Sequence, residues 1–226
     1  MRYLPINLNV QDQLCLVVGG GEVGQRKVQN LLQCGARVRL VSREMTRTLR
    51  DLVETGQVEH LGHEYRREHL KGIALAFICT DDPDVNTRAS LDAREQGIWV
   101  NVADTPALCN FILPATVSRG DLTISVSTSG SSPALAARIR GRLEREYGPE
   151  YGRFLELMQR IRARIKAEGR PTEENRKIFF SLLDSDLLKA ITRNDPAGIE
   201  KILSTILGPG YTLSSLGFKA EEEEKT

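Results

Sequence analysis

The sequence predicts an α/β protein whose first half is a Rossmann-type parallel sheet, followed by a segment of different texture and a small helical domain. Short apolar runs alternate with amphipathic stretches through residues 14–102, which is typical of repeated βαβ units. The first apolar run leads directly into a glycine-rich turn at residues 19–24. The texture changes after Phe111, which marks the end of the sheet.

The elements of the predicted sheet follow one another closely. Residues 14–18 are a continuous apolar run, as expected for a strand buried on both faces. A helix begins at Glu22 and ends at Gly35, a suitable residue for a left-handed C-terminal cap. Further strands are expected at residues 38–41, 58–61, 73–79 and 98–102, and further helices at residues 49–53 and 84–96.

The part of the chain after the sheet contains one alternating strand and then helices. Apolar and polar residues alternate over residues 122–126, the pattern of a half-exposed strand. Ser132 is a good N-cap and Pro133 suits the first turn of the next helix, which extends to residue 147. Helices are also expected at residues 151–165, 177–183, 186–192 and 196–207. We therefore predict domains at residues 1–113, 114–147 and 148–215, with a charged, disordered tail at residues 216–226.

Composition excludes several classes of protein. Lysine plus arginine (31) balances aspartate plus glutamate (30), so no overall positive field favours nucleic acid. The four cysteines lie far apart and read as small core residues of a reducing compartment. No apolar run reaches the roughly 20 residues that span a bilayer, and the N-terminus lacks a signal pattern. We expect a cytoplasmic protein that binds neither nucleic acid nor membrane.

The glycine turn predicts a dinucleotide site. Gly19 allows a tight turn, Gly21 lets a diphosphate approach the backbone, and Gly24 lets helix and strand pack closely. The free amides at the start of the helix favour a negatively charged ligand. The second strand does not end in the acidic residue that usually binds the adenosine ribose. Arg43 either faces the 2′-phosphate of NADP, or lies on the adenine of NAD while Ser42 and Glu44 bind the ribose.

A longer set of motifs resembles one family, the siroheme synthase N-terminal family of precorrin-2 dehydrogenases. The motifs are residues 3–6 (YLPI), 18–21 (VGGG), 26–27 (RK), 80–82 (TDD) with Asn86, 101–104 (NVAD), 109–112 (CNFI), 114–115 (PA) and 127–136 (STSGSSPALA). The resemblance is close over about residues 1–145 and looser beyond. It implies an NAD-binding Rossmann domain, a dimerisation segment at residues 114–147 and a helical tetrapyrrole-binding domain.

The resemblance implies NAD-dependent oxidation of precorrin-2 to sirohydrochlorin, and in some members insertion of Fe²⁺ to give siroheme. The family's catalytic aspartate corresponds to Asp104, at the carboxyl edge of the sheet where open α/β folds bind ligands. The reaction needs a base for a proton, and a carboxylate can serve. Alternatively, Asp104 only caps the turn at Thr105 and Pro106.

The resemblance also implies the residues that bind the two ligands. For NAD these are Glu22, Val23, Arg43, Glu44, Thr80 and Val102, besides the glycines. Precorrin-2 carries several carboxylates, for which arginines and the free amides of a serine-rich loop are suitable partners. The candidates are Arg119, Arg138, Ser127, Thr128, Ser129 and Ser131. Ser132 alone is explained by helix capping, and any single arginine can also be a solvated surface residue.

The strand after the parallel sheet predicts the oligomeric state. The strand at residues 122–126 lies outside the parallel sheet, and pairing of its edge across a two-fold axis predicts a homodimer, as in the family.

His60, His63 and His69 are interpreted as surface residues, with metal binding as a lesser alternative. An NAD-sensing regulatory module would keep the glycine turn but would not need Asp104. A methyltransferase would require an acidic end to the second strand, which is absent.

Overall fold

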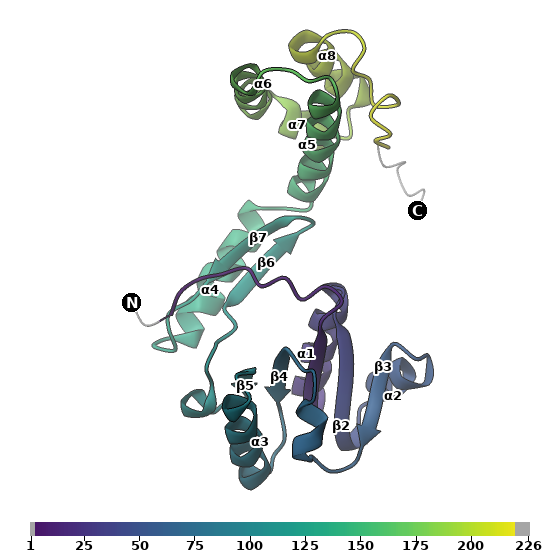
Figure 1. The fold of residues 1–226 in the computed structure, drawn as a ribbon. Helices are drawn as coiled ribbons and strands as arrows, with labels where there is room; N and C mark the ends of the chain where they lie inside the picture. Colours follow the sequence, from purple (N-terminus) through teal and green to yellow (C-terminus); the bar gives the residue numbers. More distant parts are fainter. Residues whose placement is uncertain (1–2, 220–226) are drawn as a thin grey trace. The chain divides into compact units, whose positions relative to one another are not determined.

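A computed structural model describes residues 3–219, and the chain divides into two compact units. The first unit is Met1–Leu113 and the second is Pro114–Thr226. Each unit has its own hydrophobic core. Figure 1 shows the helices and strands of both units as a ribbon. The acidic end of the predicted tail, at residues 220–226, lies outside the described residues.

The first unit is built on a five-stranded parallel sheet with the strand order β3-β2-β1-β4-β5. The chain moves outward from β1 through β2 to β3, and then returns to the other side of β1 for β4 and β5. The strands are β1 (Leu14–Gly20), β2 (Arg37–Met45), β3 (Val58–Gly62), β4 (Leu75–Ile78) and β5 (Trp99–Val102). The strand order reverses between β1 and β4, which is where open parallel sheets bind their ligands.

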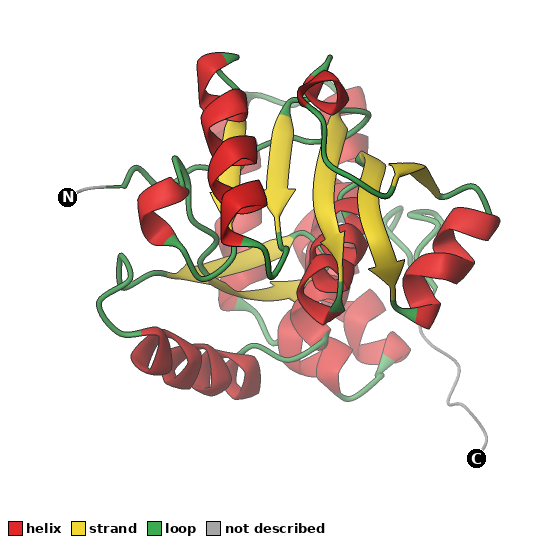
Figure 2. Cartoon of the chain, turned by 90° about the horizontal axis from the view of Figure 1, so that it is seen from below, coloured by secondary structure: helices red, strands yellow, loops and turns green. Residues whose placement is uncertain are grey.

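Helices cover both faces of this sheet (Figure 2). One face packs against α1 (Glu22–Gln33) and α2 (Arg47–Glu54), through buried residues such as Val28 and Leu49. The other face packs against α3 (Pro83–Glu95) and the short helix η1 (Arg67–Leu70). Residues Cys15, Leu16 and Val17 of β1 are fully buried, because this central strand is covered on both sides. The predicted Rossmann-type sheet is confirmed.

The second unit begins with an antiparallel hairpin of β6 (Ala115–Arg119) and β7 (Leu122–Val126). The strand at residues 122–126 was predicted, but its partner β6 was missed, so part of the pairing assigned to a second copy comes from the same chain. The hairpin packs against α4 (Pro133–Glu146) and the start of α5 (Glu150–Ala167). Ser132 caps α4 as predicted, because its Oγ accepts a hydrogen bond from the amide of Leu135 at 3.2 Å.

The rest of the second unit is a helical bundle of α5, α6 (Thr172–Asp184), α7 (Leu187–Thr192) and α8 (Pro196–Leu207). Its core contains Leu157, Ile161, Leu182 and Ile199, each 0% exposed. Leu216 and Phe218 are also buried in this core. Assigning the charged tail to begin at residue 216 was therefore wrong for these two residues, whose apolar side chains stabilise the bundle.

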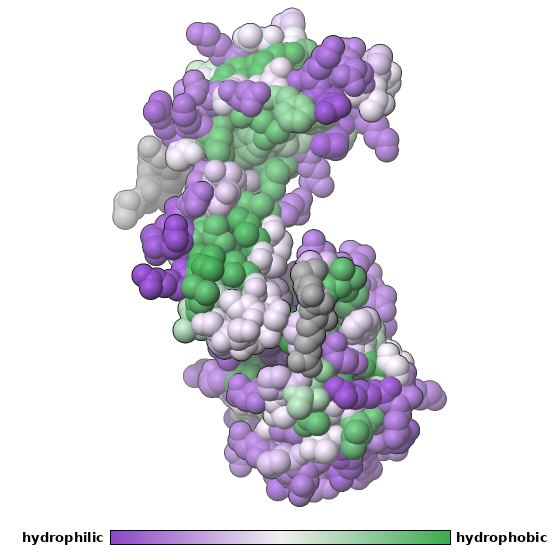
Figure 3. Space-filling view, turned by 90° about the vertical axis from the view of Figure 1, so that its left-hand side faces the viewer, coloured by the Kyte–Doolittle hydropathy of each residue, from purple (hydrophilic) through white to green (hydrophobic). Residues whose placement is uncertain are grey.

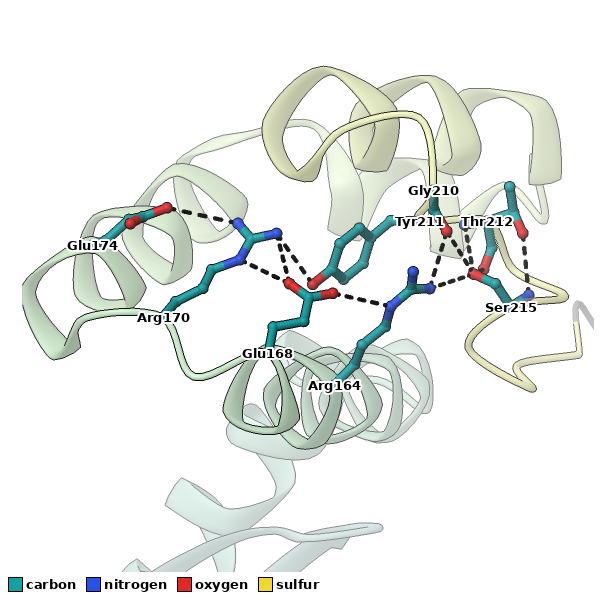
Figure 4. Close-up of polar contacts among 8 residues, drawn as sticks. All are labelled: Arg164, Glu168, Arg170, Glu174, Gly210, Tyr211, Thr212 and Ser215. Atoms are coloured by element: carbon teal, nitrogen blue, oxygen red, sulfur yellow. Dashed lines mark hydrogen bonds and ion pairs between the residues drawn. The ribbon is translucent and has the colours of Figure 1, made fainter.

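A polar network ties the end of the bundle to α5 (Figure 4). The Glu168 carboxylate accepts hydrogen bonds from Arg170 Nε at 2.8 Å and Arg164 Nε at 3.3 Å. Arg164 also donates from Nη1 to the carbonyl of Gly210 at 2.9 Å, and its guanidinium lies 4.1 Å from the centroid of the Tyr211 ring. These bonds hold the segment after α8 against α5.

The network predicts a contribution to stability that depends on pH. A hydrogen bond from Tyr211, together with the hydrogen bond and charge of Arg170 and a hydrogen bond from Arg164, lowers the pKa of Glu168. The stabilisation is therefore present above the unfolded-state pKa of about 4.3 and is lost as pH falls through the lower folded-state pKa. Thermal unfolding of Glu168→Gln should show a weaker loss of stability on acidification than Glu173→Gln, a change at an exposed carboxylate of α6. Parallel pH profiles for the two variants would contradict this assignment.

Among residues 3–219, every helix is too short or too polar to cross a lipid bilayer.

Candidate functional site

The glycine turn between β1 and α1 is shaped to admit a ligand. Gly19 has φ +109°, which L side chains rarely adopt, and a Cβ there would collide with the carbonyl of Cys79 at the end of β4. A Cβ on Gly24 would collide with the carbonyl of Gly19, so only glycine lets α1 approach β1 this closely. The two outer glycines therefore have the roles that the sequence predicted for them.

Gly21 lies between Gly19 and Gly24 in the sequence, and the space that a side chain would occupy there is open. Apart from its chain neighbours, no heavy atom of residues 3–219 lies within 4 Å of the position that a Cβ would take. Gly21 is also the N-cap of α1, and the first amides of a helix have no acceptor within the helix. Open space beside unpaired amides fits the diphosphate of a dinucleotide. Glu22 and Val23 follow on the first turn of α1.

The end of β2 lies beside this turn, because Met45 pairs with Gly20. Ser42 is buried, and its hydroxyl donates a hydrogen bond to the Glu44 carbonyl. This bond disfavours the alternative in which Ser42 binds the ribose. The Arg43 side chain is 75% exposed, and its Nη2 is 3.2 Å from Glu64 Oε1. An open groove of about 470 Å³ borders this end of the strand, lined by Arg43, Glu44, Met45, Arg50, Val53 and Glu54.

The ends of β4 and β5 complete the same edge of the sheet. Ile78 of β4 pairs with Val102 of β5, and the amide of Ala103 donates to the carbonyl of Ile78 at 2.9 Å. Thr80 follows β4, and its Oγ1 lies 2.7 Å from Oδ1 of Asn86 on α3. The glycine turn, Thr80 and Val102 therefore lie along one edge, as expected for parallel strands with this order.

Asp104 lies in the loop after β5, at this edge. It is exposed, it has φ +55°, and its carboxylate forms no hydrogen bond with any residue in 3–219. The short helix η2 (Pro106–Leu108) begins at Thr105 and has no side-chain cap. The capping alternative for Asp104 is thus unsupported. Its charge acts on two neighbours in the site. It opposes the burial that lowers the pKa of Lys27, and it adds to the burial that raises the pKa of Cys79.

Lys27 is a residue of this edge to which the sequence assigned no role. It follows Gly24 by one turn of α1, and helical side chains lean toward the helix N-terminus, here the carboxyl end of β1. Its Nζ lies 5.3 Å from the centroid of the Phe77 ring, and no ion pair joins it to the described residues. Burial lowers the pKa of Lys27, while the charges of Cys79, Cys109 and Asp104 oppose this shift. In the sequence, the RK motif at residues 26–27, which follows the glycines, was the signal that could have pointed to Lys27.

The unpaired charge of Lys27 predicts a stabilising substitution. Because burial disfavours its charged form, the cost is present at neutral pH and disappears as pH rises through the lowered pKa toward the unfolded value of about 10.4. Lys27→Met keeps the apolar stem over Phe77 and should raise the melting temperature at pH 7. Arg26→Met, at the exposed neighbour, should not. Equal melting temperatures for Lys27→Met and the unmodified chain would refute the argument.

The predicted substrate residues lie in the second unit, and the structure gives several of them local partners. The guanidinium of Arg119 donates to the carbonyls of Tyr147, Ser118 and Glu144 at 2.9–3.2 Å, which gives it a structural role at the end of α4. Arg138 is exposed on α4.

The serine-rich loop is held by hydrogen bonds among its own residues. The amides of Ser129 and Ser132 donate to Ser127 Oγ and Thr128 Oγ1, both at 3.1 Å, and the amide of Ser131 donates to the carbonyl of Thr128 at 2.9 Å. The expectation of free amides throughout this loop was wrong for these three, because the loop forms turns of its own. Ser129, with φ +53°, and Ser131 remain exposed.

The histidines have structural contacts. The Nε2 of His60 on β3 lies 3.0 Å from the carbonyl of Ser42, and the rings of His60 and His63 are 5.5 Å apart. His63 is exposed, and His60 and His69 are partly buried. The described part of the chain contains no group of three His, Cys, Asp or Glu side chains that could hold a metal ion.

Comparisons with known proteins agree with this geometry. Residues 6–115 match the family model described as putative NAD(P)-binding, and residues 119–146 match the central domain of sirohaem biosynthesis proteins. In structure, the chain is similar to SirC, precorrin-2 dehydrogenase, with a TM-score of 0.77 at 23% identity over 90% of this chain and 98% of that one. This likeness concerns the fold.

Two similar sequences are siroheme synthases. The one from Pseudomonas paraeruginosa is 38% identical over 218 residues, covering 96% of this chain and 47% of that protein. The one from Nitrosomonas europaea is 40% identical over 181 residues, covering 80% of this chain and 38% of that protein. The chain spans about half the length of these two curated relatives, or less. With both family models and these relatives in agreement, the chain belongs to the siroheme synthase N-terminal family.

Proposed function

We propose that this chain oxidises precorrin-2 to sirohydrochlorin with NAD⁺ as the acceptor. The observation that carries the proposal is Asp104, an exposed carboxylate without a hydrogen bond to residues 3–219, at the same sheet edge as the glycine turn. The names of the similar proteins, siroheme synthase and precorrin-2 dehydrogenase, support the choice of substrate.

The oxidation removes a hydride and a proton from the substrate, and the chain's residues are suited to both tasks. Bound NAD⁺ would accept the hydride. The open backbone at Gly21 and the first amides of α1 would bind the diphosphate, with Arg43 and Glu44 toward the adenosine and Thr80 and Val102 toward the nicotinamide. Asp104 would take the proton, since an ionised carboxylate with free lone pairs can act as a general base.

The substrate's carboxylates would bind to the second unit. Ser129 and Ser131 keep exposed hydroxyls next to the N-terminus of α4, and Arg138 lies exposed on that helix. Hydroxyls, a guanidinium and a helix N-terminus are all groups that bind carboxylates. Ser127 and Thr128 would shape the loop, because their oxygens already accept hydrogen bonds from it.

We also propose a cytoplasmic homodimer formed through the hairpin region. β6 and β7 form a two-stranded sheet, so each strand has an outer edge without a partner strand in the described chain. Apolar side chains gather on this part of the second unit, where Leu135 of α4 is 49% exposed (Figure 3). Sedimentation of the purified chain is expected to give twice the mass of one chain, and a single species at monomer mass would refute the dimer.

The test incubates the purified chain anaerobically with precorrin-2 and NAD⁺ and follows sirohydrochlorin by absorbance. Sirohydrochlorin should form at a rate proportional to the amount of protein, faster with NAD⁺ than with NADP⁺. Binding of NAD⁺ without sirohydrochlorin would refute the proposal and favour the regulatory alternative. Adding Fe²⁺ afterwards tests the second activity, because Asp104 could also take the pyrrole protons during metal insertion. Siroheme formed faster than without protein would establish it.

A further inference from the structure

The thiol of Cys109 is the centre of the loop that carries Asp104. The amide of Val102 donates to Cys109 Sγ at 3.1 Å, and Nδ2 of Asn101 lies 3.6 Å from the same sulfur. The sulfur in turn lies 3.3 Å from the carbonyl of Val102 and 3.4 Å from that of Thr105, so its single proton can be donated to either. One side chain therefore closes the loop from residue 102 to residue 109.

The position of Asp104 depends in part on this closure, because its carboxylate has no anchor of its own within residues 3–219. It lies between the two residues whose carbonyls face the sulfur, with a left-handed φ of +55° and no hydrogen bond from its carboxylate to residues 3–219. Left-handed backbone is sparsely populated in free chains and persists where the surrounding structure holds it. Whatever fixes the backbone at Val102 and Thr105 therefore fixes the backbone position from which the carboxylate projects.

The far side of the loop is fixed independently of the thiol. Ser90 Oγ of α3 donates to the carbonyl of Leu108 at 2.6 Å, and Arg94 Nη2 donates to the carbonyl of Cys109 at 3.0 Å. The side chain of Asn110 pairs with β5, accepting from the amide of Val100 at 2.7 Å and donating to the carbonyl of Ile98 at 3.0 Å. The position of Cys109 is thus determined by the fold. Its sulfur transmits that position to the Asp104 end of the loop, together with the bond from the amide of Leu108 to the carbonyl of Thr105 at 3.0 Å.

We propose that Cys109 is a positioning residue for the oxidation. It holds the loop so that the Asp104 carboxylate stays at the edge of the sheet that carries the glycine turn. The inference rests on the proposed function for its catalytic part. Serine at this position can make the same kinds of hydrogen bond, over shorter distances, whereas alanine makes none. The two substitutions therefore separate the hydrogen bonds of the thiol from its volume.

The kinetic test compares Cys109→Ala, Cys109→Ser and Cys34→Ala, the last at an exposed cysteine after α1. Cys109→Ala should lower kcat about 10- to 100-fold, as expected when a reacting group is misplaced by up to about 1 Å, with KM for NAD⁺ within about 2-fold of the original. Cys109→Ser should recover most of the loss, and Cys34→Ala should lose nothing. In an Asp104→Asn background, Cys109→Ala should cost little more, because both changes act on the same group.

A second measurement does not depend on activity. Hydrogen exchange at the amide of Val102 should be faster in Cys109→Ala, since that amide loses its acceptor, while exchange at Val100 stays unchanged. Wild-type kcat in Cys109→Ala, or a full additional loss in the Asp104→Asn background, would overturn the positioning role. If the unmodified chain does not oxidise precorrin-2, the proposed function fails by itself. Unchanged exchange at Val102 in Cys109→Ala would overturn the anchoring whether or not the chain is active.

Discussion

Asp104→Asn should lower the turnover of precorrin-2 oxidation by about 10²–10⁴-fold, the range expected for loss of a general base. The amide has the shape of the carboxylate but cannot accept the proton. Asparagine also tolerates the left-handed φ of +55°, so the loop should keep its conformation. The measurement is steady-state formation of NADH with saturating precorrin-2, together with NAD⁺ affinity by fluorescence titration, which should not change.

The first unit offers a matched control for this variant. Asp12 is likewise exposed and has φ +60°, but it lies before β1, outside the proposed site. Asp12→Asn should therefore leave turnover unchanged. Equal turnover in Asp104→Asn and the unmodified chain would remove the base from the mechanism, and equal losses in both aspartate variants would point to a general effect of the substitution.

The second large effect is expected at the glycine turn, where two alanine substitutions should have opposite consequences for folding. A methyl group on Gly24 meets the carbonyl of Gly19, so α1 must move away from β1. Gly24→Ala should cost about 1–3 kcal/mol of unfolding free energy, the usual range for overpacking, and should abolish NAD⁺ binding with it. Urea denaturation and fluorescence titration measure the two effects.

Gly21→Ala should separate ligand binding from stability. Gly21 has φ −74° and ψ −173°, which any residue adopts, and a methyl group there meets open space. Stability should be unchanged or raised by about 0.4–1 kcal/mol, because alanine restricts the unfolded chain. NAD⁺ affinity should nevertheless fall at least about 10-fold, since the methyl group occupies the space that the diphosphate approaches. Unimpaired NAD⁺ binding by a stable Gly21→Ala variant would place the dinucleotide elsewhere.

Much of the fold could be predicted from the sequence because its signals are local. The burial of β1, the glycines after it and the N-cap at Ser132 each follow from a few neighbouring residues. The hairpin could have been predicted as well. Thr116 and Ser118 alternate with the buried Val117, and Gly120 and Asp121 form a two-residue turn with Gly120 at φ +57°.

The length of β2 and the roles of Lys27 and Cys109 could not be predicted, because each depends on residues distant in sequence. β2 continues past Val41 to Met45 because Met45 pairs with Gly20 after an irregularity in register. The sulfur of Cys109 finds its partners only when the chain from residue 102 folds back on itself. From composition alone, this cysteine was interpreted as one of four small core residues. Lysine is usually exposed, so the residue type of Lys27 did not indicate that its side chain is partly buried.

The most direct test of the account is a crystal structure of the chain with NAD⁺ bound. We predict that the diphosphate lies over Gly21 at the start of α1, the adenosine lies toward Arg43 and Glu44, and the nicotinamide reaches the edge that carries Thr80 and Val102, with the Asp104 carboxylate directed toward it. A nicotinamide bound away from that edge, or an Asp104 carboxylate directed away from it, would contradict the proposed reaction and leave only a dinucleotide-binding fold.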